Sequence, residues 1–201
     1  MKISFASPLL GASGYATDGR SLLYTLALLK YEVHASRLLP DTDEVDLEEP
    51  LASIVAESLQ RSAIGSRINI VNRSFGEYPT DLTGRANIRR VTLETKRVPK
   101  SWVDDCNRHD QIWVPSIFNA RGFIASGVIA EKVRVVPSPL LNCDASLPLP
   151  LSRKTGSFRF LSIFRWQRRK GWDLLTRAFP RRVQPSRERG ADSQDRSVHS
   201  V

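Results

Sequence analysis

Along the first 137 residues, strand-like segments alternate with helix-like segments, and this order restricts the possible folds more than any other feature. The strand-like runs are short and rich in β-branched and apolar residues. Between them, apolar residues recur at helical spacing, for example at Leu22, Leu26 and Leu29. Because parallel strands need a crossover between them, usually a helix, this order predicts an α/β protein with a Rossmann-like, doubly wound parallel sheet.

The pattern predicts six strands in this first part, at residues 1–7, 32–39, 67–73, 86–94, 111–116 and 132–137. Helices are expected at about residues 22–29, 51–61, 102–109 and 117–126. Ser13 and Thr17 are the two candidates for the N-cap of the first helix, because hydroxyl side chains satisfy the free amides of a first turn.

Residues 1–140 are therefore expected to form one domain, and residues 141–157, which contain Pro148 and Pro150, a linker. Residues 158–179 combine a strand pattern (158–165) with a helix pattern (171–179), the start of an incomplete second Rossmann-like domain. Residues 180–201 have few apolar residues and predict a disordered tail, or one read in a shifted frame or truncated.

The net charge of +9 is local. Residues 1–152 carry 17 Lys/Arg and 17 Asp/Glu, whereas residues 153–201 carry 13 and 4, so the last quarter accounts for all of it. A short cationic cluster suits a few phosphates better than a long polyanion, and aromatic stacking platforms or a helix-turn-helix are missing from the pattern. A nucleic-acid partner is not expected, although a basic nucleic-acid-binding protein remains an alternative.

Other classes are excluded more simply. The apolar runs are far shorter than the roughly 18 to 20 residues that span a bilayer, and Cys106 and Cys143 allow one disulfide at most. Neither cysteine has neighbours at metal-ligand spacing, so we expect no metal site and a cytoplasmic location.

Two loops could bind phosphate. The loop from Gly11 to Gly19, with Gly14 at its centre, follows the first strand and precedes a helix, where free amides and the helix dipole attract anions. A plain tight turn explains it about equally well, because neither the dinucleotide nor the P-loop fingerprint is present. Arg165 and Lys170 lie in a second such loop, whose charges suit a diphosphate; a solvated basic loop is the alternative.

Several stretches resemble the GT-B glycosyltransferases of glycosyltransferase family 4, which have two facing Rossmann-like domains. The stretch QIWVPS (111–116), then FIASGV (123–128) and KVRVVP (132–137) are similar to the end of that family's N-terminal domain. The beginning of the family's C-terminal domain is similar to residues 158–179 of this chain. The matching residues are Arg165, then Lys170-Gly171, then the helix with Leu174-Leu175 and Ala178-Phe179. The resemblance covers residues 1 to about 179.

The resemblance implies transfer of a sugar, with retention, from a nucleotide-sugar donor to a hydroxyl of a glycan, lipid or small-molecule acceptor. It places Arg165 and Lys170 at the donor diphosphate and Gly14 on the facing domain. Cations beside the diphosphate stabilise the leaving group, so this mechanism needs no metal or other cofactor. The resemblance leaves peripheral membrane association open.

The chain also departs from the family. In the family, the C-terminal domain has two glutamates seven residues apart. In this chain, Glu188 is the sole glutamate after Lys170. Where many members have a histidine at the end of a central strand, this chain has Glu94, a weak catalytic candidate that a surface carboxylate explains as well. Ser116 is a weak acceptor-side candidate, and capping of the following helix explains it equally. We therefore expect the chain to have little transferase activity, with a non-catalytic Rossmann-like domain as a further alternative.

Overall fold

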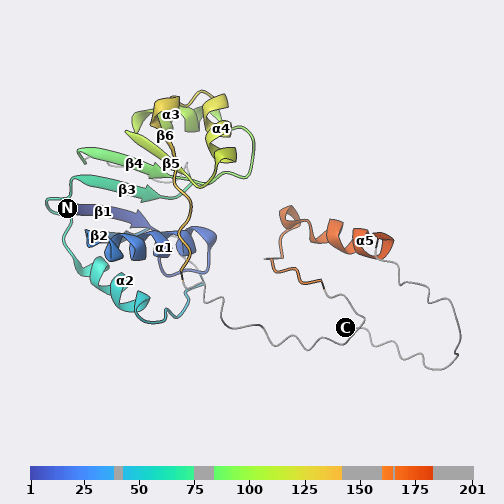
Figure 1. Ribbon diagram of the computed structural model, residues 1–201, viewed down its shortest axis with the longest axis horizontal. Coiled ribbons are helices and arrows are strands. Elements are labelled where there is room, and N and C mark those ends of the chain that lie inside the picture. Colours follow the sequence, from blue (N-terminus) through green and yellow to red (C-terminus); the bar gives the residue numbers. More distant parts are fainter. Residues whose placement is uncertain (39–42, 75–83, 142–159, 165, 183–201) are drawn as a thin grey trace, which may run out of the picture. The chain divides into compact units, whose positions relative to one another are not determined.

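The computed structural model describes residues 1–38, 43–74, 84–141, 160–164 and 166–182, with side chains up to residue 179 (Figure 1). The chain divides into two compact units, Met1–Ala145 (unit 1) and Ser146–Val201 (unit 2). The expected linker at 141–157 and the expected tail at 180–201 lie almost wholly outside the described residues.

Unit 1 contains a six-stranded sheet in which every strand pair is parallel. The strands are β1 (Lys2–Ser7), β2 (Glu32–Arg37), β3 (Ile68–Asn72), β4 (Ala86–Arg90), β5 (Gln111–Val114) and β6 (Val133–Val135), in the order β2-β1-β3-β4-β5-β6. Because β1 lies between β2 and β3, the chain reverses its direction of travel across the sheet beside β1. This confirms the expected α/β, Rossmann-like fold.

The helices of unit 1 are α1 (Gly14–Leu28), α2 (Leu51–Gln60), α3 (Lys100–Arg108) and α4 (Ile117–Ala125), with a short 3₁₀ turn at Ala130–Lys132. In Figure 1, α1 and α2 lie beside β1 and β2, and α3 and α4 lie at the opposite edge of the sheet. The core has two parts accordingly. One joins α1 and α2 to β1–β4 around Phe5 and Leu23, and the other joins α3 and α4 to β5 and β6 around Ile112 and Phe123. Each of these helices is too short, or too polar, to cross a bilayer.

Of the strands that end earlier than expected, β4 and β5 each have a clear chemical reason. β5 ends at Val114 because Pro115 has no amide hydrogen with which to continue the ladder. β4 ends at Arg90 rather than at Glu94, because both backbone groups of Thr92 bond to the hydroxyl of Tyr15 instead of to a strand. The carboxyl end of β4 therefore comes earlier in the chain than the sequence pattern predicts, at Arg90.

Unit 2 differs from the expectation. The helix is present as α5 (Trp172–Arg182), preceded by a 3₁₀ turn at Arg168–Lys170. Within the expected strand at 158–165, the described residues 160–164 belong to no strand, and the rest of that segment lies outside the described residues. A strand needs a neighbouring strand to satisfy its backbone groups, and the described residues of unit 2 provide none.

Candidate functional site

The loop after β1 leads directly into the N-terminus of α1, at the carboxyl edge of the sheet. Ser13 is the N-cap, and its side chain accepts a hydrogen bond from the Ala16 amide at 3.1 Å. Within the described residues, the amides of Gly14 and Tyr15 have no hydrogen-bond partner. A Cβ added at Gly14 would meet no atom within 4 Å, so the helix terminus is open to a ligand.

Contacts of Arg20 and Gly19 fix the conformation of the same loop on the side that faces the protein interior. Arg20, which is 8% exposed, donates to the carbonyl oxygens of Leu9 and Gly11 at 2.9 and 2.8 Å. Gly19 brings α1 against the end of β1 so closely that a Cβ would lie 2.1 Å from the Ser7 hydroxyl oxygen. These contacts preorganise the loop and leave its outer side accessible.

Tyr15 connects α1 to the segment that follows β4. Its hydroxyl donates to the Thr92 carbonyl at 3.1 Å and accepts from the Thr92 amide at 3.2 Å. Burial raises the pKa of this phenol, which therefore remains a neutral hydrogen-bonding group. Asn72, at the end of β3, donates to the Ser7 hydroxyl and to the Tyr15 carbonyl, both at 3.2 Å.

A buried ion pair closes the edge between α1 and β4. The guanidinium of Arg90 donates to both carboxylate oxygens of Asp18, at 2.6 and 2.7 Å, and to the carbonyl of Val136 and the hydroxyl of Ser138. Burial alone raises the pKa of Asp18, but hydrogen bonds from Arg90 and Ser138 more than compensate, so its pKa lies below the usual value. Asp18 is therefore a structural anion that holds Arg90, and its oxygens are already occupied.

Along this carboxyl edge of the sheet lie three of the site residues expected from the sequence, namely Gly14, Glu94 and Ser116. The backbone before Glu94 is hydrogen-bonded to two helices. Thr92 bonds to Tyr15 of α1, and the Leu93 carbonyl accepts from the side chain of Asn119 of α4. Glu94 itself is exposed. Ser116 is the N-cap of α4, accepting from the Asn119 amide at 3.2 Å, so the capping alternative is correct for this residue.

The basic loop belongs to unit 2. Lys170 ends the 3₁₀ turn, and Gly171 follows with φ of 72°, a left-handed conformation that favours glycine and starts α5. Arg165 lies outside the described residues. The pairing of Gly14 with Arg165 and Lys170 at one diphosphate therefore stays a prediction.

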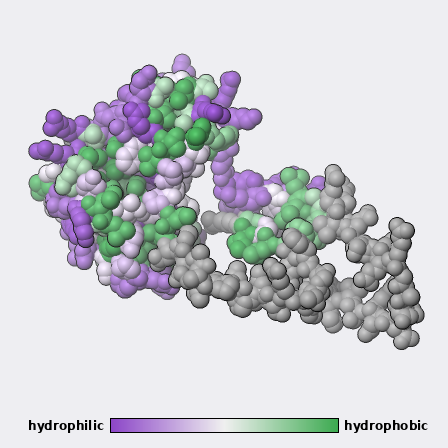
Figure 2. Space-filling view, viewed as in Figure 1, coloured by the Kyte–Doolittle hydropathy of each residue, from purple (hydrophilic) through white to green (hydrophobic). Residues whose placement is uncertain are grey.

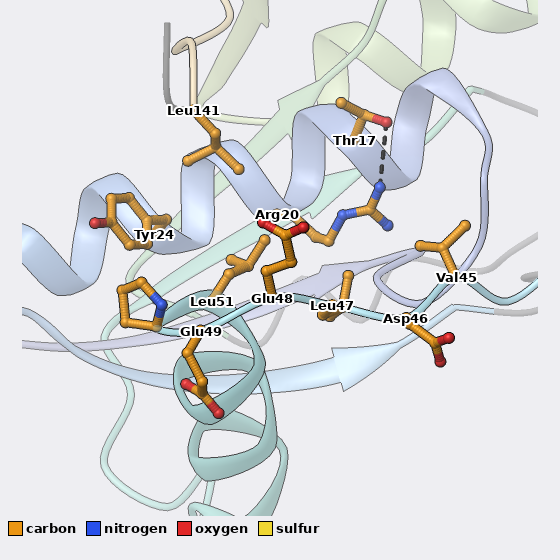
Figure 3. Close-up of a pocket in the computed structure, with 11 residues that line it drawn as sticks. Thr17, Arg20, Tyr24, Val45, Asp46, Leu47, Glu48, Glu49, Leu51 and Leu141 are labelled. Atoms are coloured by element: carbon orange, nitrogen blue, oxygen red, sulfur yellow. Dashed lines mark hydrogen bonds between the residues drawn. The ribbon is translucent and has the colours of Figure 1, made fainter. Parts of the chain in front are cut away.

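A pocket of about 310 Å³ lies on the outer side of α1 (Figure 3). Figure 3 shows Tyr24 and Leu141 on one side of it and the segment 45–51 on the other, with the carboxylate of Glu48 directed toward Arg20 and those of Asp46 and Glu49 directed away from it. Carboxylates accept hydrogen bonds from hydroxyl groups and repel phosphate. The pocket is thus chemically distinct from the open terminus of α1.

The described part of the chain holds no group of three or more His, Cys, Asp or Glu side chains placed to bind a metal ion. Cys106 is fully buried, and burial raises the pKa of its thiol to about 12, so it stays protonated and unreactive at neutral pH.

Sequence reasoning missed four residues of this edge: Tyr15, Asp18, Asn72 and Arg90. One signal for them was present. Arg89 and Arg90 are adjacent in a central strand, so their side chains point to opposite faces of a sheet that helices cover. Both side chains are therefore expected to be buried, and they are 2% and 1% exposed; Arg89 donates to the Ser74 carbonyl and Arg90 to the Asp18 carboxylate.

No protein-family model, curated protein or solved structure matches the chain. Its function therefore has to be inferred from the residues of the site and from the sequence pattern.

Proposed function

We propose that the chain is a glycosyltransferase of the GT-B type, or the donor-binding and acceptor-binding part of one. It would transfer a sugar, with retention, from a nucleotide-sugar donor to an acceptor hydroxyl. The observation that carries this proposal is the open N-terminus of α1, with two unbonded amides at Gly14 and Tyr15, beside the strand where the sheet order reverses. Ligands of open α/β sheets bind at such switch points.

The chemistry of this terminus favours an anionic group. Amides that have no intrahelical partner and the positive end of the helix dipole both stabilise a phosphate. The lack of a side chain at Gly14 lets the phosphate approach the backbone, and the contacts of Arg20 and Gly19 keep the loop in place without filling that space.

The remaining roles follow from the sequence resemblance. Arg165 and Lys170 would stabilise the charge that develops on the departing nucleotide diphosphate. Glu94, exposed on the same edge of unit 1 as Gly14, is the side chain there that could accept a proton from an acceptor hydroxyl. The Ser116 hydroxyl is engaged in capping α4, which makes it a weaker acceptor-side candidate.

Binding of nucleotide sugars to the purified chain tests this proposal. Titration calorimetry with UDP-glucose and GDP-mannose, beside a single-stranded oligonucleotide at low and high salt, separates a donor site from a general polyanion site. A nucleotide sugar that binds while the oligonucleotide does not supports the proposal. The reverse result, with affinity that falls steeply in high salt, would replace it with nucleic-acid binding.

Three substitutions locate the site. Arg165→Ala and Lys170→Ala should each weaken donor binding roughly tenfold to a hundredfold, as loss of a charge-assisted hydrogen bond does. Gly14→Asp should also weaken it, because aspartate is favourable in a first helical turn but repels phosphate. Lys100→Ala, which removes an exposed cation from unit 1, is the control. Unchanged donor affinity in all three variants would refute the assignment.

Sugar transfer is a separate question from donor binding. Transfer is measured as release of UDP or GDP in the presence of an acceptor mixture.

A further inference from the structure

The pocket beside α1 has walls that come from three parts of unit 1 (Figure 3). One face of α1 contributes Thr17, Arg20 and Tyr24, which are three and four residues apart. The segment 45–51 forms the opposite wall, and Leu141 adds a third. Its volume of about 310 Å³ lies at the lower end of the range for small-molecule sites, about 300 to 1,000 Å³.

Hydrogen bonds hold the segment 45–51 in place at both ends. The Val45 amide donates to the Leu10 carbonyl at 2.8 Å, which ties the segment to the loop after β1. At the other end, the Ser53 amide of α2 donates to the Glu49 carboxylate at 3.3 Å. The two main walls are therefore fixed before a ligand enters, which lowers the entropy cost of binding.

The same segment makes this part of unit 1 acidic. Residues 43–49 contain five carboxylates and no basic residue. Of these, Glu44 pairs with Arg37, and Glu49 accepts the bond at α2. The carboxylate of Glu48 lines the pocket and has no hydrogen-bond or ion-pair partner among the described residues. Its charge is thus free to attract a cation.

Arg20 does not turn the pocket into an anion site. Its side chain is 8% exposed, and its guanidinium donates to the carbonyls of Leu9 and Gly11 and, at 3.3 Å, to the hydroxyl of Thr17. A bound anion would have to compete with these acceptors, and the carboxylate of Glu48 would repel it.

The remaining lining is aromatic and apolar. Tyr24 is half-buried, and its ring lies across the pocket from the segment 45–51. Leu47, Leu51 and Leu141, also half-buried, supply aliphatic surface. Figure 2 shows green apolar and purple hydrophilic surface together in the part of unit 1 that holds α1 and α2. A ring face and a carboxylate both attract a cation, and the leucines suit an apolar carbon skeleton.

We propose that this pocket binds a small organic ammonium ion, with its charged nitrogen at the Glu48 carboxylate and its carbon skeleton against Tyr24 and the leucines. A neutral alcohol of the same shape lacks the charge, and a carboxylate is repelled. The proposal involves neither the open terminus at Gly14 nor unit 2, so it does not depend on the proposed glycosyltransferase activity.

Three probes of similar shape and different charge test the proposal on the purified full chain. Phenethylammonium is the cation, 2-phenylethanol the neutral analogue and 3-phenylpropionate the anion. Titrations followed by saturation-transfer NMR give the dissociation constant of each. We expect phenethylammonium to bind at least tenfold more tightly than 2-phenylethanol, with the difference reduced at high salt, and 3-phenylpropionate not to bind.

Two variants locate the site. Glu48→Gln should weaken binding of phenethylammonium roughly tenfold, as loss of a charge-assisted contact does, and should leave binding of 2-phenylethanol unchanged. Tyr24→Leu keeps an apolar side chain but removes the ring, and should weaken binding of phenethylammonium about threefold. The control is Asp104→Asn, which removes an exposed carboxylate of α3 outside the pocket and should change nothing. Circular dichroism verifies that each variant keeps its fold.

Several results would overturn the proposal. Equal affinity for all three probes would show an apolar site without charge selection. Preference for 3-phenylpropionate would show that Arg20, and not Glu48, determines the ligand. An equal loss in Glu48→Gln and Asp104→Asn would indicate general attraction to acidic surface, and absence of phenethylammonium binding to the unaltered chain would exclude the site.

Discussion

Two segments of this protein have similar sequence patterns but differ in structure. KISFAS forms β1, where Phe5 is fully buried between two neighbouring parallel strands. FRFLSIFR, at residues 158–165, has a comparable share of apolar residues, yet its described residues form no strand and Phe160 is 62% exposed. The difference shows that an apolar, β-prone segment becomes a strand when neighbouring strands are available to pair with it.

Cations show the same contrast. In unit 1, Arg89 and Arg90 are almost completely buried, and Arg90 satisfies its guanidinium with a carboxylate, a carbonyl and a hydroxyl. In unit 2, Arg168 and Lys170 are exposed. Burying a cation costs free energy unless partners compensate its charge, and the covered sheet of unit 1 provides such partners for Arg90.

The largest expected effect tests the contrast between the two phenylalanines. Phe5→Ala should lower the free energy of unfolding of unit 1 by about 4 kcal/mol, because it leaves a cavity in a fully packed core. Phe160→Ala should change it by less than about 0.5 kcal/mol, since the ring is mostly exposed. Urea unfolding followed by circular dichroism measures both. Similar losses in the two variants would mean that Phe160 is also part of the cooperative core.

A somewhat smaller effect is expected at the buried ion pair. Asp18→Asn keeps the shape of the side chain but leaves the Arg90 charge uncompensated, which should cost about 3 kcal/mol. Glu57→Gln breaks the exposed pair between Glu57 and Arg61 on α2 and should cost no more than about 0.5 kcal/mol. If both substitutions had equally small effects on urea unfolding, Arg90 would have to be satisfied without Asp18.

Two glycines of α1 have different surroundings: Gly19 is packed tightly against the end of β1, whereas the space beside Gly14 is empty. Gly19→Ala should destabilise unit 1 by about 2 kcal/mol, because the new methyl group would clash with Ser7 and with the Pro8 carbonyl oxygen. Gly14→Ala should be neutral or slightly stabilising, since that side is empty and alanine favours helix. The melting temperatures of the two variants check this order, and a destabilised Gly14→Ala would indicate that the terminus is less open than described.

The smallest effect concerns pH. His109 is 1% exposed; its Nδ1 donates to the Asp105 carbonyl at 2.9 Å, and its Nε2 is buried without a partner. Burial is the main reason that the pKa of His109 lies below its usual value. The unfolded chain therefore takes up a proton first, and stability should decrease as the pH falls below about 6.5, by at most about 1.4 kcal/mol per pH unit.

The control for this pH effect is His109→Gln, which removes the titrating group. Its free energy of unfolding should depend less on pH than that of the wild type between about pH 7.5 and 5. This range lies above the one in which Asp18 titrates, because the pKa of Asp18 is lowered from 3.8. An unchanged slope would exclude His109 as the source of acid sensitivity.

Much of unit 1 follows from its sequence pattern, because its strands and helices bury apolar residues at regular spacing. Ser13 and Ser116 were both recognisable as caps for the same local reason. The contacts of Tyr15 with Thr92 were not predictable, since they join residues 77 positions apart through a side chain. The described residues 160–164 of the expected strand at 158–165 form no strand, because local pattern specifies which residues are apolar but does not provide the neighbouring strands.

The bonds of Arg90 also impose an order on biosynthesis. Asp18 has left the ribosome long before Arg90 is made, whereas the Val136 carbonyl and the Ser138 hydroxyl follow 46 and 48 residues later. At about 5 to 20 residues per second, the nascent chain carries this cation without its full set of acceptors for several seconds. During that interval β5 and β6 are also missing from the sheet edge beside β4. Unit 1 therefore completes its fold only after residue 138 has emerged, and until then the backbone groups along the outer side of β4 have no neighbouring strand.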